Sequence, residues 1–368
     1  MSRNVFIGMM SGTSLDGVDA VACTFEPTTQ CLGHVYLPFS DALRAELQSL
    51  LTAGFDEIER CGRIAIELVG VYAQAVETLL DQAALAREQI CAIGVHGQTI
   101  RHCPQDGFTV QLNNPALLAE LTGIDVIADF RSRDMAAGGE GAPLVPAFHS
   151  ALFGSESENR AIVNIGGIAN VTLLSTDKEV PVFGFDCGPG NTLLDIWTQA
   201  HRSQPYDAQG AWAATGTVNE ALLESFLSDE YFERPAPKSS GREYFNMDWI
   251  RCELIGFPKI SAEDVQRTLV RLTAQTIVDS IRLAQPQTRS IFLCGGGVFN
   301  PVLVKDIQAL AKPATVQSSA YLGVDPMQVE AMAFAWLAWC FVNKKAGNLP
   351  AVTNAKGPRI LGALYPAF

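Results

Sequence analysis

The same succession of strands, turns and helices occurs twice along this chain of 368 residues, and this repetition restricts the fold more than any other feature of the sequence. In the first half, apolar and β-branched runs predict two strands joined by a glycine-containing turn, then a third strand, two helices and two further strands. The expected ranges are 4–10, 17–25, 31–39, 41–51, 57–85, 89–94 and 124–128.

The second half repeats this order, with two strands around another glycine turn, a third strand, helices, and a buried strand that ends in three glycines. The expected ranges are 160–164, 170–175, 182–185, 191–198, 262–284, 290–294 and 315–318. Sequence identity between the halves is low, so the repeat is structural and is not a solenoid period. Ligands of open α/β sheets lie outside the carboxyl ends of the strands, so two such domains are expected to share a binding cleft.

The chain length also favours two domains. The Gly-, Ala- and Pro-containing stretch around residues 136–146 is the expected crossover, and a strand-like segment at 359–361 is expected to return to the first domain. We therefore expect an N-terminal domain of residues 1–135 plus about 343–368, and a C-terminal domain of residues 136–342.

The formal net charge is −13, from 26 basic and 39 acidic residues. Such a molecule repels nucleic acid and anionic lipid, so neither is an expected partner, although backbone amides with Mg²⁺ can still bind a nucleotide locally. The longest apolar stretch, 331–342, is too short to span a membrane and predicts a buried helix. Nine cysteines without a C-x-x-C pair, and no signal sequence, predict free thiols in the cytoplasm.

The sharpest motif is the turn from Gly12 to Asp19. Its glycines let backbone N–H groups approach phosphate oxygens, and the hydroxyls of Thr13 and Ser14 add donors. The carboxylates of Asp16 and Asp19 can hold Mg²⁺ through water. The alternative is an ordinary hairpin, because Asp-Gly is a common turn pair. The chain has no G-x-x-x-x-G-K-[ST] segment, which excludes a P-loop.

Two carboxylates occupy positions that suit catalysis or binding. Asp186 ends a hydrophobic strand beside mobile glycines, where a general base can reach a substrate proton. The alternative is a cap for the following helix, although Asn191 competes for that place. Glu330 opens an apolar helix, where the helix dipole stabilises a carboxylate with or without a ligand.

Other polar residues and glycines also follow predicted strands. A base or ribose can lie on the backbone of residues 295–297, although a helix entry without a ligand explains the same glycines. The side chains at 96–99 can bond to sugar hydroxyls, or the histidine can be structural. Arg131 and Arg133 can pair with a carboxylate or phosphate, or form a solvated ion pair.

In combination, these motifs resemble those of the anhydro-N-acetylmuramic acid kinases, within the superfamily of actin, sugar kinases and heat-shock chaperones. They run in family order over nearly the whole chain, at 8–19, 96–99, 129–131, 136–143, 164–170, 185–191, 295–297 and 330–336. The resemblance implies an α/β fold of two actin-like, ribonuclease H-like domains around a nucleotide- and sugar-binding cleft. One departure is Cys187, where the family pattern has Thr; its matching neighbours leave the role of Asp186 unchanged.

The resemblance also implies a reaction. The enzyme would use ATP, Mg²⁺ and water to open 1,6-anhydro-N-acetylmuramic acid, a sugar released by peptidoglycan turnover, and to phosphorylate its O6. The products would be N-acetylmuramate 6-phosphate and ADP, and the pathway would be cell-wall recycling and amino-sugar metabolism. A small-molecule sugar is thus the expected partner, and a homodimer is expected from base rates alone.

The residue roles that follow are expectations of the same kind. Asp186 would be the catalytic base, and Asp16 would hold the metal through water. ATP would be bound by Gly12, Thr13, Ser14, Leu15, Asp16, Gly17, Val18, Asp19, Gly166, Gly167, Gly295, Gly296, Gly297 and Asn300. The sugar would be bound by His96, Gln98, Thr99, Arg131, Arg133, Asn170 and Glu330.

Two other functions use the same features. A sugar kinase of the superfamily that phosphorylates an ordinary hydroxyl would differ only in substrate selectivity. A nucleotide-switched binding protein such as actin or a chaperone would need a polymer or peptide surface. A sugar-responsive repressor is disfavoured because no basic helix-turn-helix segment is found.

Overall fold

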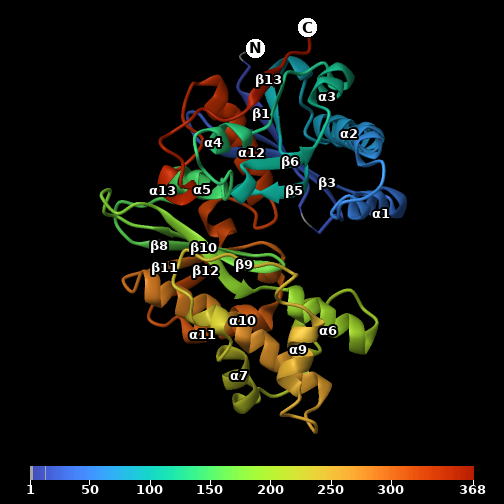
Figure 1. Cartoon of the computed structure of the whole chain (residues 1–368). Helices are drawn as coiled ribbons and strands as arrows, with labels where there is room; N and C mark the ends of the chain where they lie inside the picture. Colours follow the sequence, from blue (N-terminus) through green and yellow to red (C-terminus); the bar gives the residue numbers. More distant parts are fainter. Residues whose placement is uncertain (1–2, 13) are drawn as a thin grey trace. The chain divides into compact units, whose positions relative to one another are not determined.

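The computed structural model describes residues 3–12 and 14–368 (Figure 1). The chain divides into two compact units, one of Met1–Phe148 with Gln328–Phe368 and the other of His149–Met327. These divisions differ from the expected ones at 135/136 and 342/343. The first unit extends further at both crossovers, because residues beyond each expected division are bound to it.

Two sets of contacts explain the difference. Beyond residue 135, Glu140 N–H donates to Thr353 O (2.7 Å) and Gly141 N–H donates to Asp134 Oδ2 (2.9 Å), and this buried carboxylate also accepts from Asn348 Nδ2 (2.6 Å) and Thr353 Oγ1 (2.8 Å). The helix Val329–Val342, which was expected in the second domain, packs on the sheet of the first unit.

The sheet of the first unit has six strands in the order β13-β7-β4-β1-β2-β3. β1, β4 and β7 are parallel, whereas β2, β3 and β13 run antiparallel to their neighbours. The strands are β1 (Val5–Met10), β2 (Gly17–Thr24), β3 (Gln30–Pro38), β4 (Ile90–Val95), β7 (Val126–Ala128) and β13 (Ala363–Tyr365). A separate antiparallel hairpin is formed by β5 (Gln98–Cys103) and β6 (Phe108–Leu112).

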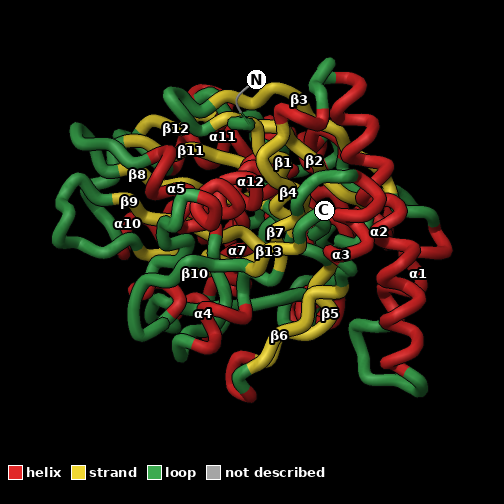
Figure 2. Tube along the Cα trace, turned by 90° about the horizontal axis from the view of Figure 1, so that it is seen from above, coloured by secondary structure: helices red, strands yellow, loops and turns green. Residues whose placement is uncertain are grey.

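Helices cover both faces of this sheet (Figure 2). Ile7 and Met9 of β1 pack into a core shared with α2, whereas Gly8, which points to the opposite face, lies against α12. A Cβ on Gly8 would lie 1.9 Å from Ala331 O, and one on Gly94 would lie 2.2 Å from Phe334 O, so only glycine allows this approach. The helices are α1 (Asp41–Ser49), α2 (Glu57–Gln82), α3 (Pro115–Thr122), α4 (Ser132–Ala136), α12 (Val329–Val342) and α13 (Pro350–Thr353).

The second unit has five strands in the order β10-β9-β8-β11-β12. β8 and β9, and β9 and β10, are antiparallel, while β8, β11 and β12 are parallel. This is the order of β3-β2-β1-β4-β7 in the first unit, so the predicted structural repeat is confirmed in topology. The strands are β8 (Arg160–Ile165), β9 (Ile168–Leu174), β10 (Phe183–Pro189), β11 (Ser290–Cys294) and β12 (Thr315–Ser318).

The helices of the second unit pack mainly around the long helix α10, whose buried residues share one apolar core with β8, β9 and β11. α5 (Val145–Phe153) contains the division between the units. The others are α6 (Thr192–Arg202), α7 (Glu220–Leu227), α8 (Glu230–Glu233), α9 (Met247–Leu254), α10 (Ala262–Ala284) and α11 (Pro301–Leu310).

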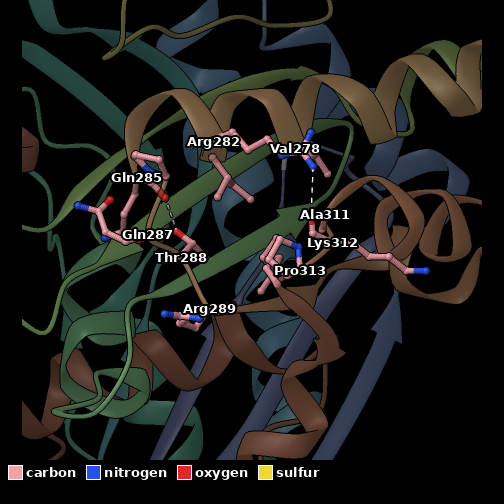
Figure 3. Close-up of a pocket in the computed structure, with 13 residues that line it drawn as sticks. Val278, Arg282, Gln285, Gln287, Thr288, Arg289, Ala311, Lys312 and Pro313 are labelled. Carbon is pink, nitrogen blue, oxygen red and sulfur yellow. Dashed lines mark hydrogen bonds between the residues drawn. The ribbon is translucent and has the colours of Figure 1, made fainter.

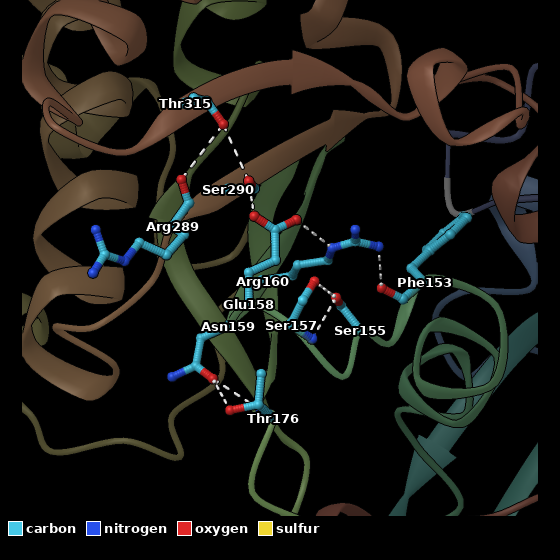
Figure 4. A network of polar contacts seen from close by, with 10 residues as sticks. All are labelled: Phe153, Ser155, Ser157, Glu158, Asn159, Arg160, Thr176, Arg289, Ser290 and Thr315. Carbon is cyan, nitrogen blue, oxygen red and sulfur yellow. Dashed lines mark hydrogen bonds and ion pairs between the residues drawn. The ribbon is translucent and has the colours of Figure 1, made fainter.

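A polar network ties together the beginnings of the three parallel strands of this unit (Figure 4). The Glu158 carboxylate accepts hydrogen bonds from Arg160 Nε and from Ser290 Oγ, both at 2.8 Å. Thr315 Oγ1 donates to Ser290 Oγ (3.1 Å). The network lies at the amino ends of β8, β11 and β12, opposite the ends where glycines follow the strands, so it supports the sheet and is remote from the predicted site.

Within the described part of the chain, no helix combines the length and apolarity that a membrane crossing requires. The most apolar segment, α12, is a 14-residue helix with ten buried residues, as the sequence predicted for 331–342.

Candidate active site

The turn between β1 and β2 is held by its own polar groups. Leu15 N–H donates to Gly12 O (3.3 Å), Ser14 Oγ donates to Asp16 Oδ1 (2.6 Å), and Phe39 N–H donates to Asp16 O (2.9 Å). Leu15 has a φ of 58°, in the left-handed region that is unfavourable for a leucine. Thr13, predicted to bind ATP, lies outside the described residues.

Some side chains of this turn point into the core, and others point to solvent. Leu15 and Val18 are core residues, 1% and 0% exposed, so they can offer only backbone groups to a nucleotide. Gly17 is required by packing, because a Cβ there would lie 2.4 Å from the backbone of β3. Ser14 and Asp16 are exposed and form the polar tip of the turn.

Behind this turn, His96 is a buried hydrogen-bond acceptor. Its Nε2 accepts a hydrogen bond from Arg131 Nε (3.0 Å). Burial and the Arg131 guanidinium lower the pKa of His96 well below its usual value, so the ring is neutral and its proton lies on Nδ1. That Nδ1 makes no hydrogen bond of normal geometry within the described chain, so it can donate to a ligand.

Arg131 joins this histidine to a set of carboxylates in the first unit. Burial lowers the pKa of Arg131 to about 10, opposed by the charges of Glu330 and Asp134, so it stays protonated at neutral pH. Burial and the charge of Asp19 raise the pKa of Glu330, and Arg131 opposes that rise. Asp19 Oδ1 in turn lies 2.8 Å from His34 Nε2.

The other predicted sugar residues of this unit are placed differently. Gln98 is 1% exposed; its Nε2 donates to Gly12 O (3.1 Å), whereas its Oε1 has no partner among the residues described. Thr99 Oγ1 accepts from Gln111 Nε2 (3.2 Å) within the β5–β6 hairpin. Arg133 lies on α4 and is exposed. It is therefore not part of the pair that His96 and Arg131 form.

In the second unit, Asp186 lies within β10 rather than at a helix cap, so the alternative role of N-cap is excluded. Its Oδ2 accepts a hydrogen bond from Ser240 N–H (3.0 Å), and its backbone N–H donates to Lys238 O (2.9 Å). Burial raises the pKa of Asp186 to about 6, opposed by the Ser240 N–H. A half-buried carboxylate with such a pKa is ionised at neutral pH and more basic than an exposed one, as a general base requires.

The pairing of β10 with β9 sets the direction in which the Asp186 side chain points. Asn170 of β9 lies directly opposite in the antiparallel register, so the two side chains leave the sheet on the same face. An irregularity in the register follows Asp186, and Cys187 is fully buried in the core of the unit. The thiol that departs from the family pattern therefore points away from the face that carries Asp186.

Two glycine turns complete the predicted residues of the second unit: Gly166 and Gly167 join β8 to β9, and residues 295–297 follow β11. A Cβ on Gly295 would lie 2.3 Å from Asn164 Oδ1, and one on Gly297 would lie 2.3 Å from Ile165 Cγ2, so packing alone requires both glycines. Gly296 faces open space, with the nearest atom 4.0 Å away. The side-chain oxygen of Asn300 caps α11 by accepting from two backbone N–H groups, so this oxygen is already used.

The residues that hold Asp186 were not predicted. Besides Ser240 and Lys238, Tyr231 Oη donates to Asp186 O (2.8 Å), and Lys238 Nζ donates to Tyr231 O (2.9 Å). In the sequence, the proline, serine and glycine residues of 235–241 indicate only a surface loop. The polar Lys-Ser-Ser-Gly segment after two prolines was the one available signal, and it does not reveal which strand the loop pairs with.

One cavity of the second unit lies elsewhere (Figure 3). It has a volume of about 210 Å³ and lies between the end of α10 and the residues before β11 and β12. Arg282, Gln285 and Thr288 are among its lining residues, and none of the predicted ATP or sugar residues lines it.

Comparison with known proteins agrees with the motifs. A sequence profile of the family described as "Anhydro-N-acetylmuramic acid kinase" matches residues 4–367. Proteins of that name from Pseudomonas paraeruginosa and Burkholderia orbicola are 53% and 50% identical to this chain. The first alignment covers 98% of this chain and 99% of the relative, and the second covers 98% and 96%.

Among solved structures, the activator of 2-hydroxyisocaproyl-CoA dehydratase from Clostridium difficile, with bound ADPNP, is 12% identical, with a TM-score of 0.47 over 92% of this chain and 96% of that one. The assignment depends on the sequence relatives. With a family profile matched over almost the whole chain and relatives at half identity along their full length, this chain belongs to the anhydro-N-acetylmuramic acid kinase family.

Proposed function

We propose that this protein uses ATP and water to open the ring of 1,6-anhydro-N-acetylmuramic acid and to phosphorylate O6, giving N-acetylmuramate 6-phosphate and ADP. Family membership supports a kinase that acts on this sugar. The hydrolytic step is supported above all by Asp186, a half-buried carboxylate oriented by Ser240 N–H, with a pKa raised to about 6 by burial.

In this mechanism Asp186 takes a proton from water as the water oxygen attacks C1 of the sugar. The bond between C1 and O6 breaks, and its electron pair stays on O6. O6 then attacks the γ-phosphorus, ADP leaves with the electrons of the broken P–O bond, and Asp186 returns its proton to solvent. The phosphoryl acceptor is therefore the leaving group of the hydrolysis, and in-line positioning controls the second step.

Sugar recognition is assigned to the first unit. His96 Nδ1 offers a buried donor, which has only an interaction with the Gly97 backbone outside normal hydrogen-bond geometry, and Gln98 Oε1 offers a buried acceptor without a partner in the described chain. Sugar hydroxyls both donate and accept, so they suit this pair. Arg131, held in place by His96 and by Gly141 O (2.8 Å), offers a cation to the lactyl carboxylate.

Nucleotide binding is assigned to the tip of the β1–β2 turn and to the glycine turns of the second unit. Asp16 is an exposed carboxylate at that tip, which fits Mg²⁺, since this ion keeps several waters and needs only one or two carboxylates. When bound, Mg²⁺ neutralises charge that develops on the phosphates.

The test is a single incubation of purified protein with Mg-ATP and the anhydro sugar in water enriched in heavy oxygen, read by mass spectrometry. The proposal expects a sugar phosphate with one heavy oxygen at C1. A sugar phosphate without the label would refute the hydrolytic step. ADP without any sugar phosphate would mean another substrate, and screening of other sugars would then distinguish an ordinary sugar kinase.

A cytoplasmic location and a homodimer belong to the same proposal. Cell fractionation tests the first, and light scattering after size exclusion tests the second.

A further inference from the structure

The β8–β9 turn is fixed to the beginning of α6. Three successive backbone N–H groups donate to it: Gly190 and Thr192 to Gly167 O, at 2.9 and 3.0 Å, and Asn191 to Gly166 O, at 2.8 Å. The turn therefore sits at the positive end of the α6 dipole, in a position set by hydrogen bonds rather than by loop flexibility.

A buried hydroxyl without a protein partner lies beside this turn. Thr192 is 6% exposed, and its Oγ1 makes no hydrogen bond with any residue that the structure describes. The point that a Cβ on Gly167 would occupy is 2.9 Å from this Oγ1. Such a hydroxyl costs free energy unless something outside the protein bonds to it.

A guanidinium lies next to the same point. Arg242 Nη2 and Nε are 3.5 and 3.6 Å from it, so one face of Gly167 carries a hydroxyl and two N–H groups. Arg242 is exposed and takes part in none of the ion pairs found among the described residues. Asp195 lies within its electrostatic range; burial raises the pKa of this carboxyl to about 7, opposed by Arg242, so the carboxyl is partly neutral at pH 7.

We propose that Arg242 and Thr192 together bind a β- or γ-phosphoryl oxygen of ATP above Gly167. This inference rests on the proposed function for the identity of the nucleotide, and it adds two residues that no motif of the sequence marked. A guanidinium fork, a hydroxyl and a helix N-terminus are the groups that proteins use to bind phosphate oxygens.

The place of Arg242 along the chain favours a terminal phosphate over the sugar carboxylate. Ser240, two residues earlier, donates its N–H to the Asp186 carboxylate. One short segment therefore reaches both the proposed base, Asp186, and the Gly167 turn. The γ-phosphoryl group has to lie near this base, because C1, which water attacks, and O6, which accepts the phosphoryl group, belong to the same sugar.

The test measures nucleotide affinity by calorimetry for AMP, ADP and a non-hydrolysable ATP analogue, with Arg242→Ala, Thr192→Val and wild type. Arg251→Ala is the matched control, since this exposed arginine forms only a surface pair with Asp248. Arg242→Ala loses a charge-assisted hydrogen bond, so it should bind ADP or the analogue roughly ten- to hundred-fold more weakly than wild type. Its affinity for AMP should stay unchanged.

Thr192→Val separates binding from folding. It removes a hydroxyl that has no protein partner and keeps the side-chain shape, so the melting temperature should stay equal or rise while affinity for the analogue falls about three- to ten-fold. A lower melting temperature with unchanged affinity would mean that the hydroxyl is structural, and would overturn its assignment.

Three results would overturn the assignment of Arg242: unchanged affinities, an equal loss for AMP, or a rise in the KM of the sugar alone, which would assign the guanidinium to the carboxylate. Failure of the proposed function is distinguishable, because wild-type protein would then bind none of the three nucleotides or would form no sugar phosphate.

Discussion

Replacement of Asp186 by Asn should abolish turnover and, at the same time, stabilise the folded protein. The second effect follows from the raised pKa. Burial moves the pKa of this carboxyl from 3.8 to about 6, which means that the folded state disfavours the ionised form. Above pH 6 the folded protein carries this unfavourable charge, whereas the unfolded chain ionises freely.

The magnitude follows from the two pKa values. At about 1.4 kcal/mol for each pH unit, the difference corresponds to about 3 kcal/mol at pH 8, as an upper bound. The asparagine can still accept the Ser240 N–H, but its own amide stays partly desolvated, so a gain of about 1–2 kcal/mol is expected. For a protein of this size, that gain should raise the melting temperature by a few degrees, on the order of 2–5 °C.

The dependence on pH has a definite sign. A carboxyl whose folded pKa is raised favours folding below its unfolded pKa and loses that contribution as the pH rises through the folded pKa. The stability of Asp186→Asn relative to wild type should therefore be highest above pH 7 and should decrease steadily as the pH falls towards 4. Differential scanning calorimetry from pH 4 to pH 8 measures it.

Asp279→Asn is the matched control, because Asp279 is exposed on α10 of the same unit, and its neutralisation should leave the melting temperature nearly unchanged. Nucleotide affinity of Asp186→Asn should stay near wild type while turnover is lost. Near-normal turnover would refute the role as base. A destabilised variant at pH 8 would refute the argument that burial of the charge is unfavourable.

Three further outcomes are expected. At saturating substrates, kcat should fall about tenfold from pH 7 to pH 5 as Asp186 becomes protonated, whereas a base of ordinary pKa would leave it almost unchanged over that range. Arg131→Ala should raise the KM of the sugar at least about tenfold, and Arg133→Ala less than about twofold, because only Arg131 is held beside His96; equal effects in steady-state kinetics would contradict this placement. Gly297→Ala should destabilise the fold because its Cβ would meet Ile165, whereas Gly296→Ala should fold normally and weaken ATP binding; thermal melts and calorimetry distinguish the two.

Much of the fold could be predicted because it depends on local signals. The helix at 262–284 and the strands at 290–294 and 315–318 have the predicted bounds. Ser40 caps α1 by accepting a hydrogen bond from Leu43 N–H (3.1 Å), as serine before an apolar helix often does. The returning strand was predicted at 359–361 but lies at Ala363–Tyr365, since a three-residue edge strand has little periodicity of its own.

Contacts between distant residues could not be predicted. Ser240 and Asp186 are 54 residues apart, and no pattern in residues 235–241 specifies that their backbone pairs with β10. The hydrogen bond between His96 and Arg131 was missed for the same reason, although the sequence named both residues separately. Sequence motifs thus identified which side chains carry chemistry, whereas the partners that set their protonation and orientation depend on tertiary structure.

Several unfavourable features of this molecule lie at or next to residues that the motifs marked, while others, such as the buried side-chain atoms of Gln266 and Ser319, lie outside these motifs. His96 Nδ1, Gln98 Oε1 and Thr192 Oγ1 are buried polar atoms without hydrogen bonds of normal geometry in the described chain, and Asp186 is a carboxylate whose charge is disfavoured by burial. A fold selected for stability alone would satisfy or remove such groups. Three of these four residues belong to motifs of the family, and the fourth, Thr192, directly follows one. Bound ligands that complete these hydrogen bonds would explain all of them together, so substrates should stabilise the wild-type protein more than any variant in which one of these groups has been made apolar.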